Sequence, residues 1–238
     1  MQPKFVHLRL HSEYSIVDGI ARIDDAVAAT AADGMPALAL TDLSNLFGMV
    51  KFYQAARSKG LKPIIGCDVW IGNDSDRDKP HRALLLCASR AGYLKLCDWL
   101  TRAYRNNQHR GRPEIQKQWL QESGTDGLIA LSGAHLGDIG HALLADNAAQ
   151  ATRHAQFWSE LFPQRFYIEL QRCGQPNAEP HVKRAVRLAS ALKLPVVATH
   201  PVQFLKREDF VAHEARVCIA EGYVLSDQRR PRACRRCG

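Results

Sequence analysis

Long apolar runs are absent from this sequence of 238 residues. No run reaches the length of about 18 residues that a membrane-spanning helix needs, and the opening residues, Met1 to His7, lack the apolar stretch of a signal peptide. Internal repeats, low-complexity segments and the glycine-rich phosphate loops G-x-G-x-x-G and G-x-x-x-x-G-K-[ST] are missing too, which weakens a nucleotide-binding interpretation. With 46% hydrophobic and 24% charged residues, we expect a globular cytoplasmic protein of one sizeable domain or two small ones.

A disulfide framework and a basic body are also absent. The seven Cys are odd in number and scattered through apolar segments, and Cys234-x-x-Cys237 has no second pair beside it to complete a zinc site. Lys plus Arg is 32 and Asp plus Glu is 24, giving +8, but residues 1–228 carry only 27 minus 24, or +3. The remaining charge comes from Arg229, Arg230, Arg232, Arg235 and Arg236. The body therefore does not indicate a surface that tracks phosphates.

Short apolar runs alternate with stretches of helical periodicity, which predicts a parallel α/β sheet, either open or closed into a barrel. The predicted strands are Phe5–Leu10, Ala37–Leu40, Ile64–Ile71, Ala83–Ala88, Leu128–Ser132, Phe166–Leu170 and Val196–Thr199. The predicted helices are Ile23–Ala32, Leu46–Ser58, Tyr93–Tyr104, Ala148–Leu161, Ala178–Leu192 and Phe210–Ala220. Gly72–Pro80 and Asn106–Pro113 are polar and predict surface loops. The second loop overlaps a basic segment with an aromatic edge, formed by Tyr104, Arg105, His109, Arg110 and Arg112. This segment could contact a partner protein or a DNA backbone, or it could be a solvated loop with no partner.

His and Asp residues gather at the predicted strand ends, where loops meet in parallel α/β folds. They are His11, Asp18, Asp42, Asp68, His81, His135 and His200. Neutral imidazoles and carboxylates in this arrangement are typical of a metal-dependent hydrolase. Polar residues are also favoured at strand ends as caps and turn formers, so both interpretations stay open.

Several motifs resemble one family. Residues 5–19, FVHLRLHSEYSIVDG, are similar to the opening of the PHP (polymerase and histidinol phosphatase) domain of bacterial replicative DNA polymerase III alpha subunits. The likeness continues in family order through PALALTDLSNLFG (36–48), KPIIG (62–66), GLIALSG (127–133), FYIEL (166–170), PVVAT (195–199) and DFVAHEARVC (209–218). The resemblance implies a distorted (βα)₇ barrel, in agreement with the seven strands above.

The resemblance also implies a set of nine metal ligands, which this sequence matches in part. Four positions are retained, as His11, Asp18, Asp68 and His81. Five are lost, as Arg9, Leu43, Ala134, Pro201 and Gln203. Leu, Ala and Pro offer no side-chain donor, and Arg9 adds a permanent cation, so we expect a vestigial site without a catalytic metal cluster or catalytic residues. Arg9 is predicted to pair with Asp18 or Asp68 instead.

The resemblance implies that residues 1–232 form a metal-depleted PHP domain of a DNA-directed DNA polymerase, entering the next domain from about residue 205. Such a domain would dock the proofreading exonuclease (epsilon) subunit within the replicative holoenzyme. Mg²⁺ and DNA would be bound by the full polymerase, whose palm aspartates are not in this sequence. Residues 233–238 depart from the family, and we expect a truncated chain, as a frameshift would produce, with a disordered tail.

Two other functions remain open. A free-standing PHP phosphoesterase would hold Zn or Mn on His11, Asp18, Asp68, His81, His135 and His200. A DNA-binding module would depend on the Arg-rich residues 229–238.

Overall fold

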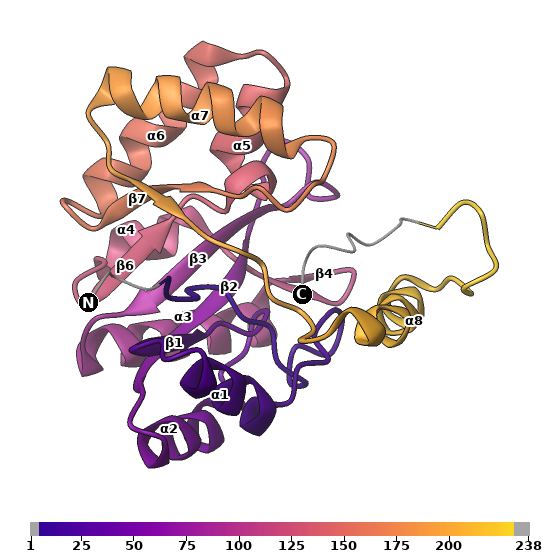
Figure 1. Ribbon diagram of the computed structural model, residues 1–238. Coiled ribbons are helices and arrows are strands. Elements are labelled where there is room, and N and C mark those ends of the chain that lie inside the picture. Colours follow the sequence, from indigo (N-terminus) through magenta and orange to yellow (C-terminus); the bar gives the residue numbers. More distant parts are fainter. Residues whose placement is uncertain (1–4, 231–238) are drawn as a thin grey trace. The chain divides into compact units, whose positions relative to one another are not determined.

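The computed structural model describes residues 5–230, so the expected disordered tail lies outside the described residues (Figure 1). The chain forms two compact units. Unit 1 comprises the described residues up to Cys67 and from His200 onward, and unit 2 comprises Asp68–Thr199. Strand β2 (Lys62–Ile71) contributes residues to both units. Within the described part of the chain, no helix is long and apolar enough to cross a bilayer.

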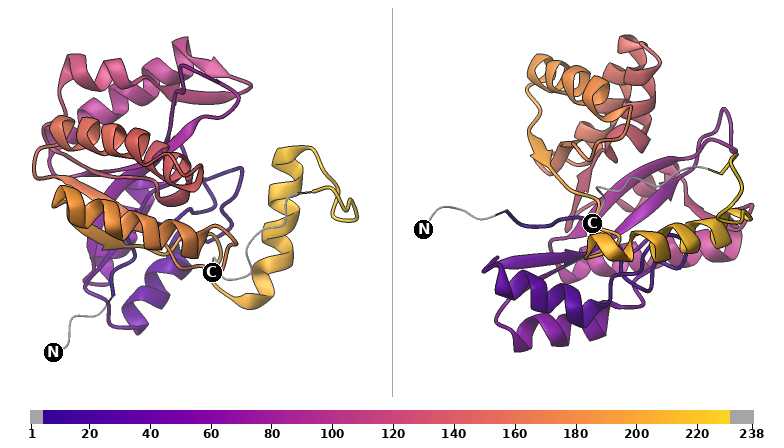
Figure 2. Two further views of the ribbon diagram at one scale, coloured as in Figure 1. Left: turned by 90° about the horizontal axis from the view of Figure 1, so that it is seen from above. Right: turned by 45° about the vertical axis from the view of Figure 1, so that its right-hand side comes forward.

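Unit 1 is built around a parallel strand pair in which β1 is the buried strand. All four residues of β1 are buried, and β1 pairs with the first residues of β2 from Ala37↔Lys62 to Leu40↔Ile65. Helices α1 and α2 pack against each other beside these strands, and Ile23, Phe52 and Leu40 belong to their common core (Figures 1 and 2). The elements of unit 1 are α1 (Ile23–Ala32), β1 (Ala37–Leu40), α2 (Met49–Ser58), η2 (Arg207–Asp209) and α8 (Phe210–Glu221).

The predicted strand Phe5–Leu10 is not formed as a strand. Leu10 makes an isolated parallel bridge with Val202, and the N–H of Ala39 and Thr41 donate to the carbonyls of His7 and Leu10. The Leu10 N–H donates to the Thr41 hydroxyl at 2.9 Å rather than to a backbone carbonyl. The segment therefore forms no regular ladder of backbone hydrogen bonds, although it runs alongside β1.

Unit 2 holds most of the sheet, in the order β4-β5-β2-β3-β6-β7-β8. The pairs β2–β5, β6–β7 and β7–β8 are parallel, whereas β3–β6 and β4–β5 are antiparallel. Helices α5, α6 and α7 pack against one another, and α7 packs against β7 (Figure 1). The elements are β3 (His81–Cys87), α3 (Arg90–Asn106), β4 (Gln108–His109), β5 (Arg112–Ile115), α4 (Lys117–Ser123), β6 (Leu128–Leu131), η1 (Ala134–Leu136), α5 (Asp138–Leu144), α6 (Ala148–Leu161), β7 (Phe166–Leu170), α7 (Ala178–Leu192) and β8 (Val196–Ala198).

Mixed α/β architecture with parallel strands is confirmed, with three local differences. The predicted loop Asn106–Pro113 contains β4 and the start of β5. Helices α4 and α5 were not predicted, because seven residues span only two turns and show little periodicity. A parallel connection needs a crossover of a dozen or more residues. The link between β2 and β3, residues 72–80, holds no helix, and β3 runs antiparallel to β6.

One glycine is required by a close backbone approach at the end of β6. Gly133 has φ +74°, and a Cβ built there would lie 2.1 Å from the carbonyl oxygen of Arg82. Any other residue here would place its Cβ against this carbonyl oxygen. Its backbone would also have to adopt the left-handed conformation that favours glycine. Gly133 thus lets the β6 turn pass directly over the start of β3.

Candidate functional site

Asp18 is the centre of the predicted site residues in unit 1. Its carboxylate lies 2.9 Å from His11 Nδ1 and accepts hydrogen bonds from the Ser15 hydroxyl at 2.7 Å and the Gln203 amide at 2.8 Å. Gln203 stands at a position where the resemblance implies a lost metal ligand. Its Nε2 donates to Asp18, whereas a metal ion would accept electron pairs from that same carboxylate. Three protein donors thus satisfy Asp18 within unit 1.

Asp42 adds a second carboxyl group in the same unit, which the sequence analysis placed at the end of β1. It accepts hydrogen bonds from the Ser12 N–H at 2.6 Å and the Ser12 hydroxyl at 2.9 Å. Burial raises the pKa of Asp42 to about 6, although the two bonds from Ser12 and the nearby His11 favour the charged form. Residue Leu43, at another lost ligand position, is buried and offers only its backbone N–H, which donates to Ser15 Oγ.

His213 of α8 is a member of this cluster that the sequence analysis missed. Its side chain is buried and makes a hydrogen bond to the backbone of Asp18. Burial lowers the pKa of His213, so the ring is neutral at pH 7. The only sequence signal was its spacing from Phe210 on one helix face, which equally indicates a core residue.

Asp68, the first predicted site residue of unit 2, forms a bidentate pair with Arg82. The Arg82 Nε donates to Asp68 Oδ1 at 3.1 Å, and Nη2 donates to Oδ2. The Asp68 side chain is 0% exposed and that of Arg82 is 9% exposed, so the pair is desolvated. The Arg82 guanidinium also lies 4.5 Å from the centroid of the Trp70 ring. The sequence analysis did not single out Arg82.

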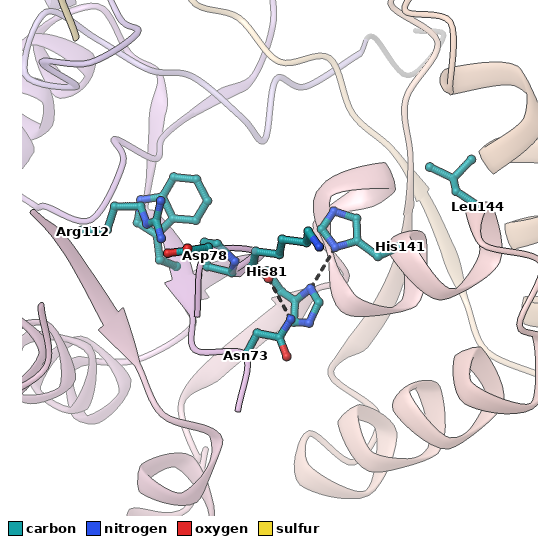
Figure 3. Close-up of a pocket in the computed structure, with 9 residues that line it drawn as sticks. Asn73, Asp78, His81, Arg112, His141 and Leu144 are labelled. Atoms are coloured by element: carbon teal, nitrogen blue, oxygen red, sulfur yellow. Dashed lines mark hydrogen bonds between the residues drawn. The ribbon is translucent and has the colours of Figure 1, made fainter. Parts of the chain in front are cut away.

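His81 lies next to Arg82 on β3 and therefore points to the opposite face of the strand. Its Nδ1 is 3.0 Å from His141 Nδ1 on α5, and its ring centroid is 6.5 Å from that of His154 (Figure 3). Burial lowers the pKa of His81 to about 4. Within unit 2, the structure therefore brings Asp68 together with Arg82 and not with His81.

The remaining predicted positions are spread over other surroundings. Ala134 is buried in η1, and the His135 ring beside it lies 6.5 Å from that of His181. His200 lies 6.3 Å from the His7 ring and lines a cavity of about 190 Å³ in unit 1. Arg9 is 5% exposed, and its predicted pairing with Asp18 or Asp68 stays a prediction. Pro201, at another lost ligand position, is half-buried in unit 1.

The donor sets within each unit do not fit a metal cluster. Among residues 5–230, no group of three or more His, Cys, Asp or Glu is arranged to hold a metal ion. The Asp18 carboxylate receives an amide N–H, and the Asp68 carboxylate receives a guanidinium. The neutral amide occupies a lone pair of Asp18 as a hydrogen-bond donor, and the guanidinium brings a full positive charge to Asp68, so both take up oxygen atoms that a metal ion would need.

The basic segment before β5 is largely neutralised. Asp78 lies 2.7 Å from His109 Nε2 and 3.0 Å from Arg110 Nη2, and Arg112 lies 3.6 Å from the buried Glu114. These pairs favour a loop held by its own ion pairs over one that tracks a nucleic-acid backbone.

The sequence matches a protein-family model described as "PHP domain" over residues 7–173. The chain belongs to the PHP domain family. Within the family, it is similar to proteins named DNA polymerase III subunit alpha. It is 50% identical over 236 residues to the one from Neisseria meningitidis serogroup A, 47% identical over 232 residues to that from Pseudomonas aeruginosa, and 45% identical over 231 residues to that from Escherichia coli K12. These matches cover 97–98% of this chain but 20% of each relative, so the chain spans about a fifth of their length.

Solved structures show the same fold at low sequence identity. An amidohydrolase from Chromobacterium violaceum gives a TM-score of 0.57 at 14% identity, covering 89% of this chain and 96% of that one. A protein from Bifidobacterium adolescentis described as a metal-dependent phosphoesterase gives 0.55 at 11% identity, covering 82% and 86%. The predicted PHP-type α/β fold class is confirmed.

Proposed function

We propose that this chain is the PHP domain of a DNA-directed DNA polymerase of the DNA polymerase III alpha type and serves DNA replication in the cytoplasm. The identity of 45–50% over nearly the whole chain supports this assignment. Nucleotidyl transfer with Mg²⁺ belongs in this proposal to the whole polymerase and not to the residues described above.

In this proposal the domain itself is structural and metal-depleted. The hydrogen bond from Gln203 to Asp18 carries the argument, because an amide donor takes the place of a ligand that would bind the same metal ion as Asp18. The Arg82–Asp68 pair supports the same conclusion in unit 2. Both contacts convert carboxylates suited to a cation into internal hydrogen-bond acceptors, which stabilises the fold without a metal.

We further propose that the domain docks the proofreading exonuclease (epsilon) subunit. The likeness to a replicative polymerase subunit supports a place among holoenzyme subunits. Mixing the 238-residue chain with purified exonuclease subunit should give a 1:1 complex by size-exclusion chromatography with light scattering. Two separate peaks at concentrations of tens of micromolar, a range in which a weak specific complex still forms, would overturn the docking proposal.

Metal analysis tests the structural role. After incubation with Mn²⁺ or Zn²⁺ and dialysis, the chain should retain well under one ion and should not hydrolyse p-nitrophenyl phosphate or DNA ends. Dialysis controls for loosely associated ions, and a known metal-loaded PHP phosphoesterase serves as the positive control.

A second function, a metal-dependent phosphoesterase, is favoured by one observation. His11 and Asp18, two retained ligand types, still lie 2.9 Å apart. Two or three tightly bound ions together with hydrolysis that is lost in H11A would establish this second function and refute the metal-depleted one.

A further inference from the structure

Helix α2 of unit 1 carries large apolar side chains that face solvent. Phe47, just before the helix, is 69% exposed, and Val50 and Tyr53 are 59% and 50% exposed. Their spacing of three residues places them on one face of the helix. Arg57, which is exposed and follows Tyr53 by four residues, continues this row. These four residues form the α2 stripe. Apolar side chains that gather on one exposed face are typical of an interaction surface.

The backbone under the α2 stripe is fixed at both of its faces. In the turn before the helix, the buried Asn45 side chain accepts from the Phe47 N–H at 3.1 Å and donates to the Tyr14 carbonyl at 3.0 Å. On the opposite face of α2, Phe52 and Ala56 are fully buried in the core of unit 1. The helix therefore cannot roll to bury the stripe, and little backbone entropy is lost when the stripe binds a partner.

The two ends of the α2 stripe differ in chemistry. Lys51, the one charged residue between Phe47 and Arg57, is held by Glu13 at 3.2 Å and by Asp24 at 3.5 Å. In the part of the chain that the structure describes, the Arg57 guanidinium has no ion pair or hydrogen bond. An aromatic ring thus stands at one end of the stripe and an unpaired guanidinium at the other. With a rise of about 1.5 Å per residue, these two ends are about 15 Å apart.

These two ends complement each other when two copies of the chain pack with their α2 helices antiparallel. A two-fold axis through the middle of the stripe brings Phe47 of each copy against Arg57 of the other. The Val50 and Tyr53 side chains of both copies then meet at the centre. A guanidinium over an aromatic face is attracted by the ring. A parallel arrangement would instead bring the two guanidinium groups together, so charge selects the antiparallel one.

We infer that the α2 stripe is an isologous interface between two copies of this chain. A second copy is the occupant because one stripe supplies both halves of each end contact, the ring of Phe47 and the guanidinium of Arg57. Both end contacts form twice under the two-fold axis, and the uncharged centre brings no like charges together. Three apolar side chains per copy make a small interface, so we expect a dissociation constant of about 10–100 µM.

Sedimentation velocity of the 238-residue chain tests this interface, with a reductant present to prevent disulfide-linked dimers of the free Cys residues. Between about 1 and 300 µM, the mass should rise from that of one chain toward that of two. F47R places two guanidinium groups together, and R57E places a carboxylate against the ring, so each should weaken dimerisation about tenfold or more.

A mixture of the two variants tests the antiparallel arrangement itself. In a heterodimer of F47R and R57E, one end keeps the native ring and guanidinium, and the other end gains an arginine–glutamate ion pair. An equimolar mixture should therefore dimerise about tenfold more tightly than either variant alone. Within one chain the two positions are about 15 Å apart, too far for the new charges to pair.

I219R is the matched control, because Ile219 of α8 is 80% exposed and the same change is made outside the α2 stripe. It should dimerise like the native chain. A native chain that stays monomeric at about 300 µM, a mixture no tighter than its components, or an equal loss in I219R and F47R would each overturn the proposal. So would a monomeric native chain whose binding to the purified exonuclease subunit is lost in F47R, since the stripe would then hold that protein instead.

Discussion

Removing the Arg82 guanidinium should destabilise the protein more than any surface charge change. In R82A, the Asp68 carboxylate loses both hydrogen bonds from Arg82 while its side chain stays 0% exposed. Taking one partner from a buried ion pair costs about 3–5 kcal/mol, because the remaining charge is left poorly solvated. Loss of the contact with the Trp70 face adds about 0.5–2 kcal/mol.

A double-mutant cycle in urea separates the pair from its surroundings. R82A and D68A should each lower the unfolding midpoint by about 1 M or more, since the slope for a chain of this size is near 3 kcal/mol per M. The double variant should be less unstable than the sum of the single variants, with a coupling of about 2 kcal/mol or more. R82K tests geometry, since lysine keeps the charge but lacks the bidentate fork.

R102A is the control for this prediction, because its side chain is 35% exposed and its ion pair with Glu122 is 3.8 Å long. It should cost less than about 1 kcal/mol. A coupling between Arg82 and Asp68 under about 0.5 kcal/mol would refute the reasoning, because it would show that the two side chains act independently.

Three further changes address pH and charge. The pKa of Asp42 is raised to about 6 by burial, so the protonated carboxyl group stabilises the fold fully below about pH 4. About 3 kcal/mol of the free energy of unfolding is then lost as pH rises through 6. D42N should not show this loss when its urea unfolding is compared at pH 4 and pH 7. The pKa of His181 is lowered to about 4 by burial, so its contribution is present above about pH 6.5 and is lost as pH falls toward 4. H181L should therefore flatten the acid side of the stability profile. Q203E places a second carboxylate beside Asp18 and should lower the free energy of unfolding by about 1–3 kcal/mol at pH 7, with partial recovery of the melting temperature in Mn²⁺.

Each of these predictions has a contrary outcome. Equal stability differences between D42N and the native chain at pH 4 and 7 would contradict the Asp42 assignment. If the stability of H181L and of the native chain fell in parallel as pH is lowered from 6.5 to 4, the prediction for His181 would be contradicted. Q203M removes the amide without adding charge, so equal destabilisation by Q203M and Q203E, with no response to Mn²⁺, would show that charge is not the cause.

Local sequence signals were sufficient for the long elements. The predicted ranges Ile23–Ala32, Ala148–Leu161 and Ala178–Leu192 agree with α1, α6 and α7, because each has an apolar face repeated over several turns. Ala37–Leu40 agrees with β1, whose four residues are all buried. The segment Phe5–Leu10 has the composition of a strand, but its pairing depends on partners far along the chain, and Thr41 takes one of its N–H groups.

By itself the sequence determined the family, the α/β class and the two retained residues that meet, His11 and Asp18. Only the tertiary structure showed that Gln203, which is 185 residues from Asp18 in the chain, donates to its carboxylate. It also decided that Arg82 and not His81 faces Asp68. The physical reason is the two-residue period of a strand: a shift of one position turns the side chain to the other face, and no local pattern states which face meets a distant partner.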